Sequence, residues 1–125
     1  MSTIKANTLL HSDGSTTTQP SIPALDTRMA TAWVAFNGTG TVAIKGDYGV
    51  SSITDLDTGD YQINFSTNRA SVTYSATACT YRQVAWTDGG ITIRNHTVSS
   101  VRVTNVEYAS GAGADSPYVS VNIFG

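Results

Sequence analysis

The side chains that could carry out chemistry are few and lie far apart in the chain. His11 and His96 are the only two histidines, and Cys79 is the only cysteine. A metal centre needs several ligands at short, regular spacings, and a cysteine nucleophile needs a neighbouring base and an orienting carboxylate. The residues around these three positions offer neither arrangement. The sequence therefore predicts no catalytic residue, no metal site and no cofactor, and it favours Cys79 as a small buried apolar side chain.

Two groups of residues resemble ligand sites without meeting their requirements. Asp55, Asp57 and Asp60 surround a glycine. They lack the spaced ligands and the terminal glutamate of a calcium loop, so a turn is the better interpretation. Six aromatic residues would form a sugar-stacking surface if they were exposed together, but aromatic residues in strands more often lie in a core or a subunit interface, and we favour that interpretation. These residues are Trp33, Tyr48, Tyr81, Trp86, Tyr108 and Tyr118.

The composition argues against several classes of partner. Charged residues make up only 13% of the 125 residues, the net charge is −2, and the seven lysines and arginines are scattered, so nucleic acid is not an expected partner. No segment approaches the roughly 20 apolar residues of a membrane helix, and residues 1–5 do not lead into the apolar run of a signal peptide. A lone cysteine forms no intrachain disulfide. We therefore expect a protein made in a reducing cytoplasm, with no membrane partner.

These side chains are carried by a chain with the pattern of β-strands. From residue 31 onward, apolar and polar residues alternate, and turn signals recur at short intervals. The pattern predicts eight or nine strands, at residues 31–37, 41–44, 50–56, 61–65, 70–77, 79–86, 91–94 and 98–108, and around Val119, Val121 and Ile123. Turns are predicted at residues 37–40, 46–49, 57–60 and 88–90, and a Gly-rich loop at 110–117. Residues 31–125 are therefore predicted to form one antiparallel β-sandwich or barrel, jelly-roll-like, with very little helix.

Residues 1–30 differ in composition and are predicted to form an extended N-terminal arm. Pro20 and Pro23 each favour extended conformations in the residue before them, and a short helical turn is predicted at 24–29. The segment has too little apolar surface to offset its own ordering entropy, so other subunits must hold it. The candidate anchors for that contact are its large apolar side chains, Leu9, Leu10, Ile22, Leu25 and Met29.

Several stretches of the chain resemble a family of short bacteriophage structural proteins, found in marine and freshwater phages and often described as tail-fibre-like. The resemblance lies in residues 32–44 (AWVAFNGTGTVAI), 50–55 (VSSITD), 59–65 (GDYQINF), 2–9 and 21–26. It covers roughly half of the chain and does not extend to residues 66–115. The resemblance implies a virion component, usually trimeric, without assigned catalysis.

The arm and the resemblance together predict a non-enzymatic virion structural protein on the particle surface. A chain of 125 residues is short for a fibre. This length favours a capsid decoration (cement) subunit that trimerises and clamps neighbouring subunits of the phage major capsid protein through its arm. The alternative is a tail-fibre or adhesin module that binds a host cell-surface glycan. The homotrimer interface is predicted to bury some of four residues, Trp33, Phe36, Tyr61 and Phe65.

Overall fold

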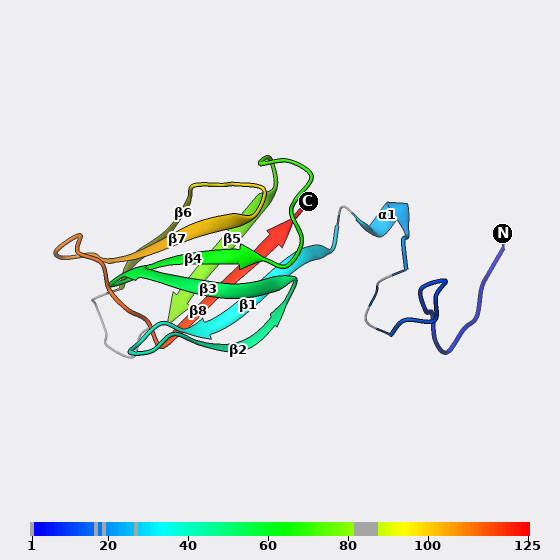
Figure 1. Cartoon of the computed structure of the whole chain (residues 1–125), viewed down its shortest axis with the longest axis horizontal. Coiled ribbons are helices and arrows are strands. Elements are labelled where there is room, and N and C mark those ends of the chain that lie inside the picture. Colours follow the sequence, from blue (N-terminus) through cyan, green and yellow to red (C-terminus); the bar gives the residue numbers. More distant parts are fainter. Residues whose placement is uncertain (1, 17, 19, 27, 82–87) are drawn as a thin grey trace.

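The computed structural model describes residues 2–16, 18, 20–26, 28–81 and 88–125, and most of its regular structure is β-strand (Figure 1). A one-turn helix, α1 (Pro23–Asp26), precedes the first strand. The strands follow as β1 (Ala30–Asn37), β2 (Ala43–Tyr48), β3 (Val50–Asp57), β4 (Asp60–Phe65), β5 (Ser75–Tyr81), β6 (Asp88–Arg94), β7 (Ser100–Glu107) and β8 (Tyr118–Phe124).

Within the described ranges, the strands form two four-stranded sheets packed face to face. Sheet A has the strand order β2-β1-β8-β5, and sheet B has the order β3-β4-β7-β6. Every strand pairing in both sheets is antiparallel. The chain crosses between the sheets after β2, β4, β5 and β7, so each sheet is built from distant parts of the sequence. The predicted antiparallel β-sandwich is confirmed.

The core lies between the sheets and follows from the alternation in the sequence. Successive side chains of a strand point to opposite faces, so every second residue enters the core. The rings of Phe36 and Tyr61 pack edge to face with their centroids 5.1 Å apart, and those of Phe65 and Tyr74 do so at 5.6 Å. The buried apolar residues of the core are Ala32, Val34, Phe36, Val50, Tyr61, Ile63, Phe65, Tyr74, Val101, Val103, Val119, Val121 and Ile123.

Three of the four residues predicted for the trimer interface belong to this core instead. Phe36 and Tyr61 are fully buried in the single chain, and Phe65 is 7% exposed. Their side chains pack in the core of the same domain, so they offer little surface to a second subunit. Sequence periodicity identifies a buried face but does not tell whether the same chain or another one covers it. Trp33 alone of the four remains exposed, at 40%.

Three predicted boundaries are also wrong, and two of them fall at glycines. β2 runs through residues 46–48, where a turn was predicted, because these residues pair with residues 33–35 of β1. β6 includes residues 88–90, also a predicted turn. β5 begins at Ser75, so the predicted strand at 70–77 is mostly irregular. The predicted strand at 79–86 overlaps the end of β5, and its residues 82–86 lie outside the described residues.

Cys79 is not the buried side chain that the sequence suggested. In β5 the residues that face the core are Ala76, Ala78 and Thr80. Cys79 lies between them in sequence and therefore points to the opposite face, where its side chain is exposed. The sulfur atom stands on the outer surface of sheet A.

The Gly-rich loop is fixed to the end of the sandwich by close backbone contacts. Asp115 Oδ1 accepts hydrogen bonds from the Gly59 amide, at 2.7 Å, and from the Tyr61 hydroxyl, at 2.8 Å. Burial raises the pKa of Tyr61 above its ordinary value, and the bond to Asp115 adds to this, so the hydroxyl stays protonated as a donor. Asn105 Nδ2 also donates to the Ala114 carbonyl at 2.7 Å. Residues 113–116 are therefore tied to the turn at residues 58–59 and to the neighbouring strands.

Candidate assembly surfaces

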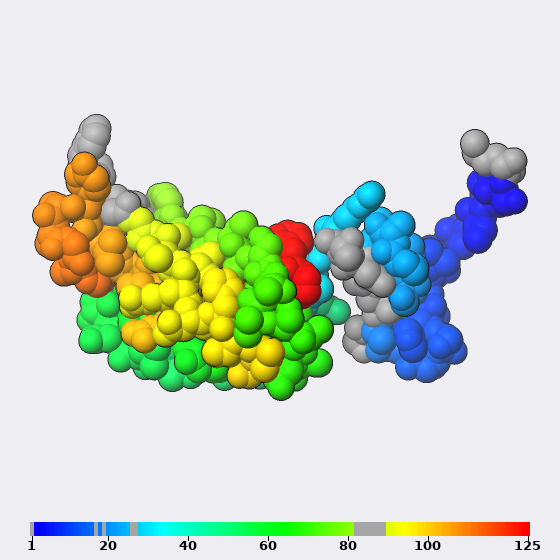
Figure 2. All heavy atoms as spheres, turned by 90° about the horizontal axis from the view of Figure 1, so that it is seen from above, coloured from blue at the N-terminus to red at the C-terminus, as the bar shows by residue number. Residues whose placement is uncertain are grey.

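The described residues of the arm that precede β1, 2–16, 18, 20–26 and 28–29, present a series of exposed apolar side chains. The arm lies beyond one end of the sandwich as a separate lobe (Figure 2). Local bonds shape it: the Gly14 amide donates to the His11 carbonyl at 2.8 Å, and the Leu25 amide donates to the Ile22 carbonyl at 2.7 Å. All five predicted anchors are exposed, and so is Ile4, which is 88% exposed. The anchors are thus available for contact with another chain, and their role as anchors stays a prediction.

The arm leaves the sandwich through a neck fixed at Thr31. The Thr31 hydroxyl lies 3.3 Å from the Ile123 carbonyl and 3.2 Å from the Gly125 carbonyl, and it can donate to either. Arg69 Nη1 donates to the Thr31 carbonyl at 3.3 Å, and the Arg69 guanidinium lies over the ring of Phe65. These contacts tie the first residues of β1 to the end of β8 and to the loop after β4. The junction between the arm and the domain is therefore held in place.

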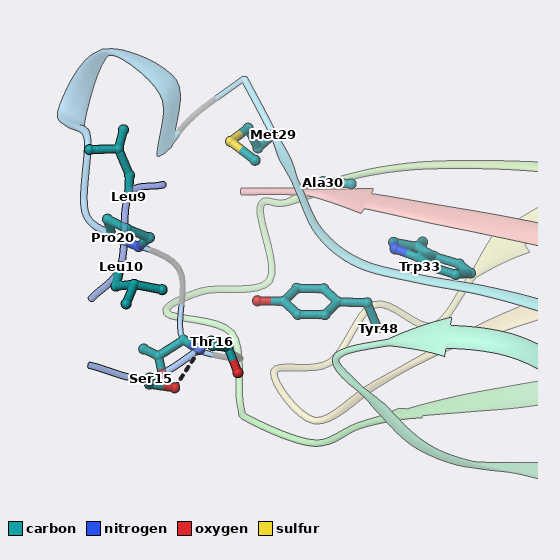
Figure 3. A pocket seen from close by; sticks show the side chains of 10 residues that line it. Leu9, Leu10, Ser15, Thr16, Pro20, Met29, Ala30, Trp33 and Tyr48 are labelled. Carbon is teal, nitrogen blue, oxygen red and sulfur yellow. Dashed lines mark hydrogen bonds between the residues drawn. The ribbon is translucent and has the colours of Figure 1, made fainter. Parts of the chain in front are cut away.

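A hollow of about 460 Å³ lies between the arm and the domain. Figure 3 shows Leu9, Leu10 and Pro20 on the arm side, with Trp33 and Tyr48 on the domain side. Trp33 and Tyr48 are direct cross-strand neighbours on β1 and β2, and about two-fifths of each side chain remains exposed. The arm thus leaves this apolar surface partly open.

A second exposed aromatic group lies at the other end of sheet A. Tyr81 and Tyr118 are cross-strand neighbours on β5 and β8, and both are exposed. With Pro117 and Lys45 they line a hollow of about 510 Å³. Lys45 Nζ donates to the Pro117 carbonyl at 3.1 Å and lies 5.3 Å from the centroid of the Tyr118 ring. Two tyrosine rings beside an ammonium group can stack against a sugar or against another protein.

The outer face of sheet B is polar instead, and its side chains bond to one another. Asn64 Nδ2 lies 3.0 Å from the hydroxyl oxygens of both Ser52 and Thr54. Asp60, whose side chain is only 10% exposed, accepts a hydrogen bond from Arg102 Nε at 2.6 Å and a second one from Arg102 Nη2. Arg94 Nη2 lies 3.5 Å from the same carboxylate. This face satisfies its polar groups within the chain.

The interactions of Asp60 make the stability of the domain depend on pH. The hydrogen bond from Arg102 holds the pKa of Asp60 below its ordinary value of 3.8, with the charges of Arg102 and Arg94 adding to it against the opposing effect of burial. A carboxylate with a lowered pKa contributes stability above 3.8, and this contribution is lost as the pH falls through the lowered value.

We expect Asp60→Asn to lower the free energy of unfolding at pH 7 by about 2 kcal/mol. The difference from the unsubstituted protein should shrink as the pH falls from 3.8 through the lowered pKa of Asp60, because protonation of Asp60, first in the unfolded chain and then in the folded chain, removes its contribution. Urea unfolding at pH 7 and at pH 2.5 measures both effects. Asp47→Asn, at an exposed carboxylate of β2, is the matched control and should have little effect. An equal loss at both pH values would contradict the electrostatic explanation.

The side chains singled out for chemistry are not brought together. His11 lies in the arm with Nδ1 3.0 Å from a carboxylate oxygen of Asp13. His96 packs against the ring of Tyr74 with centroids 5.0 Å apart, and Cys79 stands alone on sheet A. Among the described residues, no three His, Cys, Asp or Glu side chains form a group that could hold a metal ion. Within the same residues, no helix is long and apolar enough to cross a membrane.

Five of the six aromatic residues, for which a core or a subunit interface was favoured, are exposed in the single chain and do not lie in its core. Trp33, Tyr48, Tyr81 and Tyr118 lie on the outer face of sheet A, and Tyr108, in the loop after β7, is 83% exposed. The alternation of apolar residues along the strand could have predicted this exposure. Val119 points inward, so Tyr118 must point outward. The sixth aromatic residue, Trp86, lies outside the described residues. Comparison with known proteins adds no relative, since no family model, curated protein or solved structure matches the chain.

Proposed function

We propose that this protein is a non-enzymatic bacteriophage virion subunit, most simply a capsid decoration (cement) protein. The observation that carries the proposal is the arm, whose large apolar side chains are between 39% and 88% exposed. A soluble monomer seldom leaves so many large apolar groups in water along one segment, and such groups mark a contact with another macromolecule. The arm therefore reaches across neighbouring coat subunits, and the sandwich sits on the outer surface of the shell.

The physical chemistry of the arm suits attachment to a repeating shell. Each Leu or Ile side chain that becomes buried contributes roughly 1.5–3 kcal/mol before the cost of ordering the chain is subtracted. The stretches between anchors can add strands to exposed sheet edges of the coat protein. Several weak contacts linked in one chain multiply into firm attachment. The protein is made in the host cytoplasm, assembles as a homotrimer and binds virion proteins, with no nucleic acid, membrane or cofactor.

A second candidate function is a tail-fibre or adhesin module that binds a host cell-surface glycan. The observation that favours it is the hollow beside Tyr81, Tyr118 and Lys45. Sugar rings stack on exposed aromatic faces, and the ammonium group of Lys45 would suit an acidic sugar. This candidate gives no role to the apolar side chains of the arm, which is why we rank it second.

The number of copies per particle separates the two functions. We expect on the order of hundreds of copies in purified virions, set by the shell symmetry, measured by quantitative mass spectrometry against the major capsid protein. About three to eighteen copies, set by the symmetry of a tail, would replace decoration with the fibre function. Absence from purified virions would refute both.

A further inference from the structure

The outer face of sheet A is arranged in rows that run across its four strands. The registers of β5, β8, β1 and β2 place equivalent residues side by side at each level of the sheet. The first row contains Tyr81 and Tyr118. The second row contains only small side chains, Cys79, Ser120, Ala35 and Gly46. The third row contains Thr77, Asn122, Trp33 and Tyr48. Aromatic side chains thus flank a small-residue row.

This face is almost free of charge. β1, β5 and β8 contain no charged residue. On β2, Lys45 is engaged with Tyr118 and Pro117, and Asp47 pairs with Val34, whose side chain enters the core. The centres of protein interfaces are depleted in charge and enriched in aromatic residues, whereas the outer face of sheet B contains Asp60, Arg94 and Arg102. Apart from Lys45, such a face can pack against the same face of a second copy without requiring any complementary charge.

The width of the sheet fits a three-fold arrangement. Four strands about 4.8 Å apart span about 19 Å, so three such sheets forming the sides of a triangle lie about 5.5 Å from their common axis. In a β-sandwich, sheets about 10 Å apart lie about 5 Å from their midplane, which is nearly the same distance. Side chains of ordinary size, such as those of the two aromatic rows, therefore reach toward the common axis of such a triangle. Each face has a projected area of about 440 Å², about half of the roughly 800 Å² per partner of a standard interface.

We propose that three copies of this chain bring the outer faces of their A sheets together around one axis parallel to the strands. The proposal rests on the trimer of the proposed function and names the surface that forms it. In this arrangement β2 of one copy lies beside β5 of the next, with equivalent rows at the same level. Tyr48 then lies near Thr77 of the neighbouring copy, and Gly46 lies near its Cys79. Trp33 points toward the axis, and sheet B faces solvent.

Cys79 provides a probe of this surface that needs no engineering. In the trimer its thiol is covered, so we expect the full-length protein at micromolar concentration to react with a maleimide at least tenfold more slowly than a monomeric variant. Thr77→Arg should supply that variant, because it places a charge in the interface beside Tyr48. Thr92→Arg is the matched control, since Thr92 is an exposed threonine in β6, the corresponding edge strand of sheet B. Sedimentation should give a trimer for the unsubstituted protein and the control, and a monomer for Thr77→Arg.

The outcomes separate this proposal from the proposed function. An oligomer with a freely reactive Cys79 would overturn the surface assignment while leaving a virion role intact. A monomer with a reactive Cys79 that becomes protected only on shells would assign the face to the coat protein and overturn the proposal. Both measurements on the unsubstituted protein decide the question even where Thr77→Arg fails to fold. The copy number in virions tests the virion role independently.

Discussion

Deletion of residues 2–25 is expected to release the protein from the particle while leaving the sandwich folded. The strands begin at Ala30, and the core contains no residue of the arm, so the truncated chain keeps its fold. It loses Leu9, Leu10, Ile22 and Leu25, each worth roughly 1.5–3 kcal/mol when buried. Even after the ordering cost is subtracted, the affinity for shells should fall by at least about a hundredfold. Co-sedimentation with shells that lack the protein measures this loss, and circular dichroism verifies the fold.

A pair of matched variants shows which arm residues carry the attachment. Leu9→Ser combined with Leu10→Ser should weaken binding to shells. Thr8→Ala combined with His11→Ala, at the flanking positions, should leave binding nearly unchanged. If the truncated protein binds empty shells with unchanged affinity, the arm is a passive tail, and the decoration function loses its main support.

Gly113→Ala is expected to destabilise the sandwich strongly. A Cβ at this position would overlap the Thr58 carbonyl oxygen, which belongs to the turn between β3 and β4. The backbone cannot move aside easily, because the Ala114 amide donates to the Asn105 carbonyl at 3.0 Å and Asp115 holds Gly59. We expect a loss of about 3 kcal/mol in the free energy of unfolding, as for severe overpacking.

Thermal and urea unfolding measure this loss, with Gly90→Ala as the control. Gly90 lies in β6, and a Cβ there would meet nothing within 4 Å, so the control should change stability by less than about 0.5 kcal/mol. Similar stabilities for the two variants would mean that residues 113–116 are not held rigidly against the turn at residues 58–59.

The sequence predicted the architecture well because the alternation of apolar and polar residues can be recognised within each strand. That alternation determines which face of the strand enters the core. Val101, Val103 and Asn105 occupy alternate positions of the strand predicted at residues 98–108, and all three are buried in the structure. The sandwich arises because two sheets that each have one apolar face must cover one another. The predicted all-β domain needed no information about distant contacts, only the period of the pattern.

The candidate surfaces were harder to predict because they depend on pairings between distant strands. The row that contains Cys79 and Ala35 exists only because both β5 and β1 pair with β8. No pattern within a single strand predicts this strand order. The same limit explains the error at Phe36 and Tyr61, which a single chain already buries. The arm was predicted from its composition, because composition decides whether a segment can form its own core, and its role stays a prediction.

The loop after β7 makes one end of the molecule different from the other. It projects at the end of the sandwich opposite the arm (Figure 1). Its second half is fastened to the turn at residues 58–59, whereas Tyr108 and the residues up to Ala112 are exposed and a Cβ at Gly111 would meet open space. A subunit attached to a surface through its arm would hold this tip farthest from that surface. The tip is therefore the natural place to graft a foreign peptide for display, because neither the core nor the attachment segment would have to change.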